Sequence, residues 1–94
     1  MKAIVMVGPK KSEYVKVADL SPQEGQILVK MKYVGMCMSE WHPWAEAKKG
    51  DRFGHEPMGR VAQVGSCVTG FKIGQRVTGL SSTPCYAEYC LMEA

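Results

Sequence analysis

Residues 54–59 read Gly-His-Glu-Pro-Met-Gly and place a histidine and a glutamate side by side. An extended stretch follows from Gly59 to Val64, and the Gly65-Ser66 pair ends it. Because turn-forming residues bound this stretch, we predict a short strand with His55 and Glu56 just ahead of it.

The segment upstream of this stretch has a different character from the rest of the chain. Residues 37–49 show no alternation and contain two tryptophans, a His-Pro step and an Ala-Glu-Ala-Lys-Lys run. We therefore predict a loop with a helical turn or two.

The other strand candidates are short and are separated by Gly and Pro. They are residues 1–7, 14–17, 26–33, 71–77 and 85–91. The clearest is 26–33, where one side holds Ile27, Val29, Met31 and Tyr33 and the other holds Lys30 and Lys32. Short strands separated by frequent turn residues predict a mainly β chain. We expect a small barrel from which one loop, carrying the functional residues, extends.

Size and charge narrow the function classes. The 94 residues are 46% hydrophobic, enough for one small packed domain over 1–94 and too few for a second, dinucleotide-binding fold. The net charge of +3 comes from scattered residues with acidic ones among them, which favours a solvated surface over nucleic-acid binding. The apolar run at residues 1–7 is too short for a membrane span or a signal core, so we expect no membrane partner.

The chain has four cysteines, Cys37, Cys67, Cys85 and Cys90. In a secreted protein they could form two disulfides. Because no signal peptide precedes them, we expect a cytoplasmic protein whose reduced cysteines are free to ligate metal.

Both histidines of the chain, His42 and His55, lie within residues 37–56, together with Cys37, Ser39, Glu40 and Glu56. Cys37 and His55 lie on opposite flanks of the predicted loop, which could fold them onto one zinc ion beside Glu56. The two residues are eighteen positions apart. Spacing of this kind, taken alone, favours a buried cysteine and a surface histidine over a metal site.

Four motifs in order resemble those of the medium-chain zinc-dependent alcohol dehydrogenase family. Residues 54–59, with Gly65 and Val68 after them, fit the family signature that begins G-H-E-x-x-G. The other three are residues 35–42, similar to G-x-C-x-[ST]-[DE]-x-H; 70–77, similar to G-F-x-x-G-D-R-V; and 86–89, similar to F-A-E-Y. The resemblance implies the family's N-terminal GroES-like catalytic domain, a partly open β-barrel with a short helical loop segment.

The resemblance also implies roles for the polar residues of the loop. Cys37 and His55 match zinc ligands, and Glu56 matches a carboxylate beside the zinc. The implied catalytic residues are Ser39, which would hydrogen-bond the substrate oxygen; Glu40, which would orient the ligand histidine; and His42, the end of a proton relay. From residue types alone, Ser39 and Glu40 are also typical of a helix start, and His42 before Pro43 of a turn.

The chain departs from the family pattern in several places. It contains no G-x-G-x-x-G, so the dinucleotide-binding domain is absent from these residues. The family's third zinc ligand falls after residue 94, and we expect weak zinc binding for that reason. Gln75 replaces the usual Asp, and with only Cys85 and Cys90 after residue 77 we predict no second, structural zinc.

The resemblance implies an NAD(P)-dependent alcohol or polyol dehydrogenase that transfers hydride with the help of zinc, acting on a small alcohol or carbonyl substrate. We expect the chain by itself to be inactive, because hydride has no acceptor without the Rossmann domain. The alternative is a non-enzymatic GroES-like module for binding or assembly, since fold does not fix function. Exposed sheet edges also make a homo-oligomer a possibility.

Overall fold

The computed structural model describes all 94 residues and is mainly β, as predicted. Its strands are β1 (Lys2–Gly8), β2 (Lys11–Lys16), β3 (Gln26–Gly35), β4 (Glu56–Val64), β5 (Arg76–Thr78) and β6 (Tyr89–Glu93). Between β3 and β4 lie the 3-10 turn η1 (Met38–Glu40) and the helix α1 (Trp41–Ala45), which confirms the predicted helical loop. Neither helical segment is long and apolar enough to cross a membrane.

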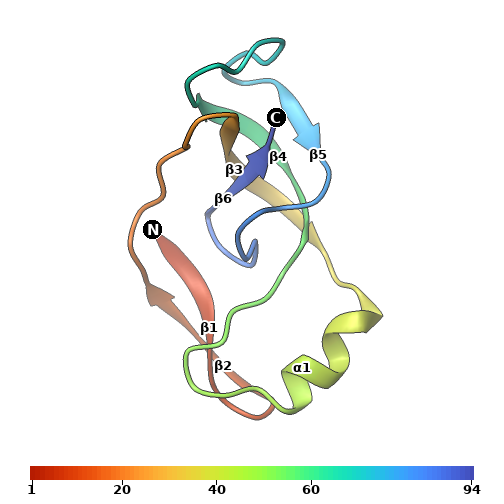
Figure 1. Cartoon of the computed structure of the whole chain (residues 1–94). Coiled ribbons are helices and arrows are strands. Elements are labelled where there is room, and N and C mark those ends of the chain that lie inside the picture. Colours follow the sequence, from red (N-terminus) through yellow and green to blue (C-terminus); the bar gives the residue numbers. More distant parts are fainter.

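Two antiparallel sheets build the fold (Figure 1). β1 pairs with β2, and the larger sheet has the strand order β5-β4-β3-β6. An isolated bridge between Ala3 and Ala87 joins β1 to the segment directly before β6. No further strand pairing closes the structure, so it is a partly open barrel, as the sequence predicted.

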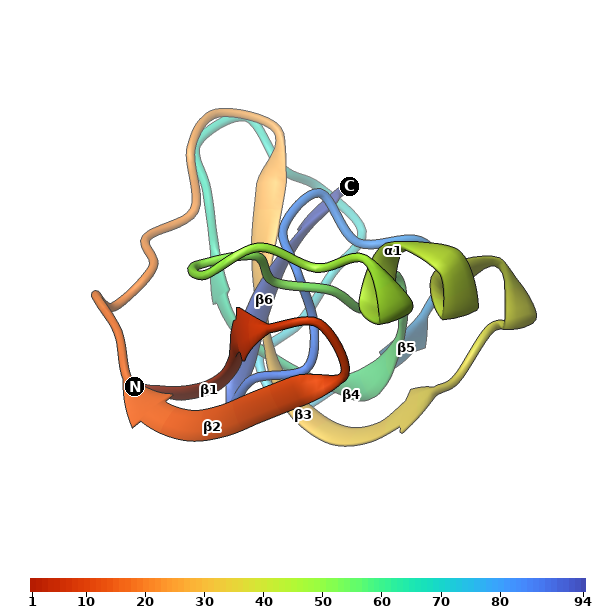
Figure 2. The ribbon, with the colours of Figure 1, turned by 90° about the horizontal axis from the view of Figure 1, so that it is seen from below.

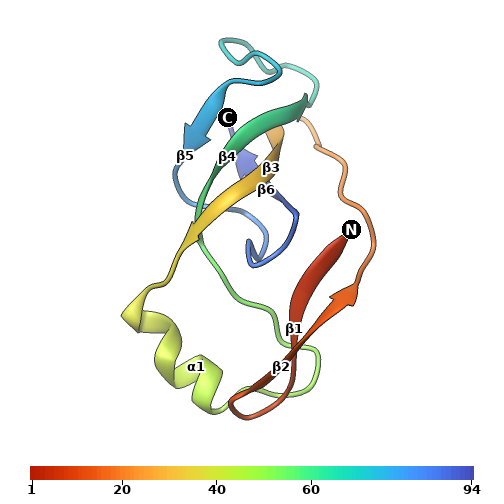
Figure 3. The ribbon, with the colours of Figure 1, turned by 180° about the vertical axis from the view of Figure 1, so that it is seen from behind.

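The helical loop extends from the end of β3 toward the β1–β2 hairpin (Figure 3). Seen from below, α1 lies beside that hairpin (Figure 2). The backbone N–H of Lys10, at the hairpin turn, donates to the carbonyl oxygen of Trp44 at 3.1 Å. The loop is thus held at the end of the barrel at which β3 finishes and β4 begins.

The hydrophobic core lies on one face of the larger sheet. Its buried members come from β3, β4, β6 and the segment before β6: Ile27, Val29, Val61, Cys85, Cys90 and Met92. Burying one aliphatic side chain such as Ile27 or Val29 stabilises the fold by about 1.5–3 kcal/mol relative to leaving it in water. The core thus fixes β3 as the central strand from which the helical loop departs.

The predicted alternation of β3 is correct as far as Met31 and wrong at Tyr33. Tyr33 is 66% exposed, whereas Val34 packs against the core. The register of β3 against β4 shifts between Met31 and Tyr33, so an extra residue enters β3 there. A bulge of this kind reverses which side chains face inward, and it aims the end of β3 differently from its start.

Two other strands are shorter or later than predicted. Of residues 71–77 only 76 and 77 are extended, because the chain turns at Gly70 and Gly74, which both have positive φ. Strand β6 begins at Tyr89 rather than at Cys85. Residues 85–88, directly before β6, instead form backbone hydrogen bonds with β1 and with the segment before His55.

The glycines of the 54–65 signature are required by close backbone contacts. A Cβ on Gly59 would lie 2.1 Å from the Lys30 carbonyl oxygen, and one on Gly65 would lie 2.0 Å from that of Gln23. Gly54 has a φ of +104°, and a Cβ there would lie 2.7 Å from the Tyr86 backbone nitrogen. Only glycine fits positions at which two backbones approach this closely.

Candidate metal centre

The β3–β4 pairing closes the eighteen-residue gap between Cys37 and His55. Gly35, the last residue of β3, pairs with Glu56, the first residue of β4. Cys37 follows β3 in an extended conformation directly before η1, and His55 directly precedes β4. The loop therefore leaves and re-enters the sheet at neighbouring points, with its flanking side chains close together.

Cys37, His55 and Glu56 each offer one metal-ligating atom, and these atoms all lie within 4.8 Å of one another. Cys37 and His55 are half-buried and Glu56 is exposed. Gly35 leaves room for the glutamate, since a Cβ there would lie 3.2 Å from the Glu56 Cβ. The structure thus brings together all three residues predicted as ligands; their metal binding itself stays a prediction.

The chemistry of this donor set fits a zinc ion. Zinc accepts a thiolate sulfur, an imidazole nitrogen and a carboxylate oxygen together, in a four-coordinate arrangement. A thiolate and a carboxylate also balance the two positive charges of the ion. Residues 1–94 offer three protein donors, one of them exposed, so a four-coordinate zinc would take its fourth ligand from outside this set.

Glu40 lies behind His55, where the sequence predicted an orienting carboxylate. Its Oε1 lies 3.0 Å from His55 Nδ1, although the two groups lack the alignment of a full hydrogen bond and Oε1 has no other partner. The Glu40 side chain is only 14% exposed. If Nδ1 faces this carboxylate, Nε2 is the nitrogen available to a metal.

Tyr86 is a member of this cluster that the sequence analysis did not single out. Its hydroxyl donates to Glu40 Oε2 at 2.7 Å. Burial, and then the bond to Glu40, raise the pKa of the Tyr86 hydroxyl, so it remains a donor at neutral pH. The available signal was small: this chain has tyrosine where the F-A-E-Y segment begins with phenylalanine.

The two other predicted catalytic residues are placed differently. Ser39 lies beside the candidate ligands, and its Oγ donates to Cys37 Sγ at 3.0 Å. His42 is exposed on α1, and its ring makes no hydrogen bond or ion pair. The proton relay that would connect them stays a prediction.

All four cysteines are free thiols. Cys85 and Cys90 are buried, as expected of small apolar residues. Cys67, in contrast, is exposed and lies at a turn with a φ of 62°. Burial raises the pKa of the Cys85 thiol, and it raises the pKa of Cys90 to about 12.

Alkylation should separate these thiols. In the native chain we expect iodoacetamide to label Cys67 and Cys37 and to spare Cys85 and Cys90, because the thiolate is the reactive form and burial disfavours it. Zinc should then protect Cys37 but not Cys67. Peptide mass spectrometry after timed labelling measures both effects. Equal rates at Cys85 and Cys67, or equal protection of Cys37 and Cys67, would contradict this arrangement.

Comparison with known proteins gives concordant matches. The family described as "Alcohol dehydrogenase GroES-like domain" matches residues 23–94. The chain is 32% identical over 93 residues to an L-threonine 3-dehydrogenase of Xanthomonas oryzae pv. oryzae (strain MAFF 311018), covering 90% of this chain and 27% of that protein. It is 36% identical over 99 residues to an uncharacterized zinc-type alcohol dehydrogenase-like protein of Escherichia coli (strain K12), covering 96% and 28%.

The fold is also found in a solved structure of a Pseudomonas syringae pv. Tomato DC3000 quinone oxidoreductase. The TM-score is 0.83 at 27% identity, and the match covers 98% of this chain and 31% of the other. The chain therefore spans about a quarter of the length of the two curated relatives, at 27% and 28%.

Proposed function

Because the chain belongs to the alcohol dehydrogenase GroES-like domain family, we propose that residues 1–94 form the zinc-site domain of an NAD(P)-dependent alcohol dehydrogenase. The observation that supports this most directly is the cluster of Cys37, His55 and Glu56. Fold alone does not select the chemistry, since the same fold is found in a quinone oxidoreductase. A thiol, an imidazole and a carboxylate gathered at one point favour a zinc-dependent alcohol dehydrogenase.

The polar residues of the loop have distinct tasks in this proposal. Zinc bound by Cys37, His55 and Glu56 would supply Lewis acidity that lowers the pKa of an alcohol hydroxyl. Ser39 Oγ, which lies 3.0 Å from Cys37 Sγ, would accept the hydroxyl proton of the alcohol while it passes its own proton on toward the bound cofactor. His42, exposed on α1, would deliver that proton to solvent.

We propose a small alcohol as the substrate, or the matching carbonyl compound in the reverse direction. The curated relatives include L-threonine 3-dehydrogenases and a zinc-type alcohol dehydrogenase-like protein. They support oxidation of a hydroxyl group by a nicotinamide cofactor and leave simple alcohols, amino alcohols and polyols as candidate classes. Hydride transfer needs a cofactor held against the substrate, so the complete enzyme would include a nucleotide-binding domain.

The surface beside the candidate ligands is suited to meet that domain. Met36 and Met38, on either side of Cys37, are 87% and 88% exposed. Exposed apolar side chains of this kind beside a functional site are typical of a surface that another domain covers. We propose that the nicotinamide approaches the substrate from this face, and a second copy of the chain is the other candidate to cover it.

The activity of the complete protein tests the proposal. With NAD⁺ or NADP⁺ and a panel of small alcohols, the near-ultraviolet absorbance of the reduced nicotinamide should rise. A chelator should stop the reaction and zinc should restore it, whereas the 94-residue chain alone should give no turnover. A complete protein that binds zinc but turns over no alcohol or carbonyl compound would favour the non-enzymatic module.

A further inference from the structure

Two backbone hydrogen bonds hold Tyr86 in place, one to the segment before His55 and one to β1. Its backbone N–H donates to the carbonyl oxygen of Phe53 at 3.2 Å, and its own carbonyl oxygen accepts from the N–H of Ile4 at 2.9 Å. The first bond attaches it to the segment that leads into His55, and the second attaches it to β1. The backbone of Tyr86 is therefore held between these two segments.

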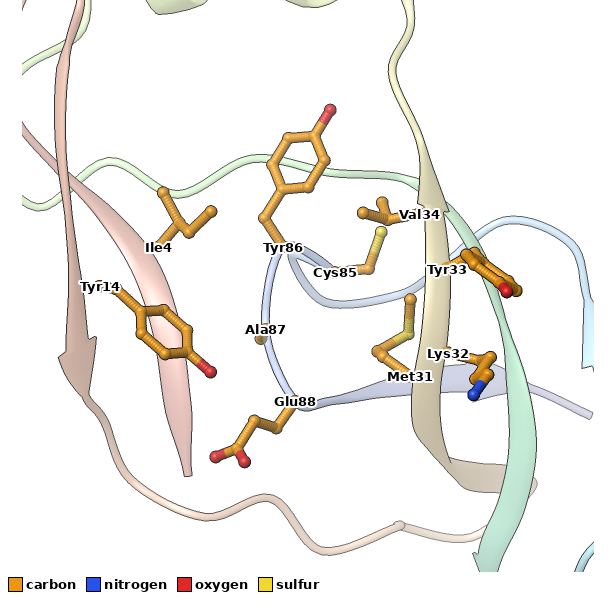
Figure 4. A pocket seen from close by; sticks show the side chains of 10 residues that line it. All are labelled: Ile4, Tyr14, Met31, Lys32, Tyr33, Val34, Cys85, Tyr86, Ala87 and Glu88. Carbon is orange, nitrogen blue, oxygen red and sulfur yellow. The ribbon is translucent and has the colours of Figure 1, made fainter.

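The ring and the hydroxyl of Tyr86 have separate surroundings. The ring forms part of the wall of a mostly apolar pocket that also includes Ile4 and Ala87 (Figure 4). The hydroxyl points away from Ala87 and Glu88 and leaves the pocket (Figure 4). A phenylalanine, the residue usual at this point of the resembling segment, would pack the same ring. The packing of the pocket therefore does not require the hydroxyl.

The hydroxyl instead determines how the Glu40 carboxylate is turned. Glu40 ends η1, a turn of three residues that has no side-chain cap of its own. A carboxylate held at one oxygen can no longer rotate freely about its last bond. With Oε2 bound to Tyr86 at 2.7 Å, Oε1 is the oxygen that faces His55 Nδ1 at 3.0 Å.

We propose that Tyr86 is a positioning residue for the metal centre, whose hydroxyl acts through Glu40 to set the orientation of the His55 ring. This inference rests on the proposed function, because it requires His55 to ligate a metal. Removing an outer partner that contacts a ligand directly typically costs about 10–100-fold in metal affinity. Tyr86 acts one step further out, so we expect a loss of about three- to tenfold on removing its hydroxyl.

The test is the affinity of the Tyr86→Phe variant for Co²⁺. This ion substitutes for zinc and can be followed by its absorption spectrum. We expect weaker Co²⁺ binding and shifted ligand-field bands, because the imidazole is less well held. The thiolate-to-cobalt absorption should keep its intensity, since Cys37 is unchanged. Tyr89→Phe is the matched control, because the Tyr89 hydroxyl in β6 makes no hydrogen bond. Urea unfolding checks that both variants remain folded.

A double-mutant cycle separates positioning from general packing. In a Glu40→Ala background the added Tyr86→Phe change should have little further effect on cobalt affinity, because the carboxylate through which Tyr86 acts is gone. An undiminished effect there, or parent-like binding by Tyr86→Phe alone, would overturn this inference and leave the proposed function standing. A complete protein that binds no cobalt would overturn both.

Discussion

Cys37→Ala and His55→Ala are each expected to lower the zinc affinity of the chain at least about 100-fold, the upper end of what loss of an outer partner costs. Each change removes one of only three donors gathered within 4.8 Å. Loss of Cys37 also removes one of the two negative charges that would balance the ion. The exposed carboxylate of Glu56 and one remaining donor would then hold the ion through two bonds and water.

Cys67→Ala is the matched control for these two variants. It also removes a thiol, but from an exposed turn outside the cluster, and it should leave zinc affinity unchanged. Calorimetric titration of the reduced chain with zinc measures all four proteins, and unfolding in denaturant shows whether each variant is folded. Equal loss in all three variants would mean that zinc binds elsewhere or non-specifically.

The metal centre was only partly predictable from the residues. Their types and the motif order identified Cys37, His55 and Glu56, and the structure gathers all three. What the sequence does not state is the register that closes the gap, the pairing of Gly35 with Glu56. Strand pairing is a long-range choice, so it cannot be deduced from the local pattern of either strand.

Two features escaped prediction for different physical reasons. The exposure of Tyr33 follows from the bulge between Met31 and Tyr33, which depends on β4 and is invisible in the alternation of β3 itself. The bond from Tyr86 to Glu40 joins residues 46 positions apart, across two separate segments. A tyrosine at this point is equally compatible with a role in packing alone, so residue type could not distinguish the two.

The second large effect is expected from Gly59→Ala, which changes one of the glycines of the 54–65 signature. This single methyl group should destabilise the fold by about 3 kcal/mol or more, the upper end for overpacking. The new Cβ would lie 2.1 Å from the Lys30 carbonyl oxygen, which is fixed backbone in the central strand. β3 and β4 would have to separate at the Met31–Gly59 pair. A domain of this size has only about 5–15 kcal/mol of stability in total.

Gly8→Ala isolates the steric cause, because a Cβ on Gly8 would meet nothing within 4 Å. It should change the free energy of unfolding by less than about 1 kcal/mol. Neither glycine has the positive φ that would add backbone strain, so the two variants differ mainly in available space. Urea unfolding followed by circular dichroism measures both. Since β4 begins with Glu56, Gly59→Ala should also weaken zinc binding. A Gly59→Ala chain as stable as Gly8→Ala would mean that β3 and β4 pair in a different register, and the proximity of Cys37 and His55 would then lose its structural basis.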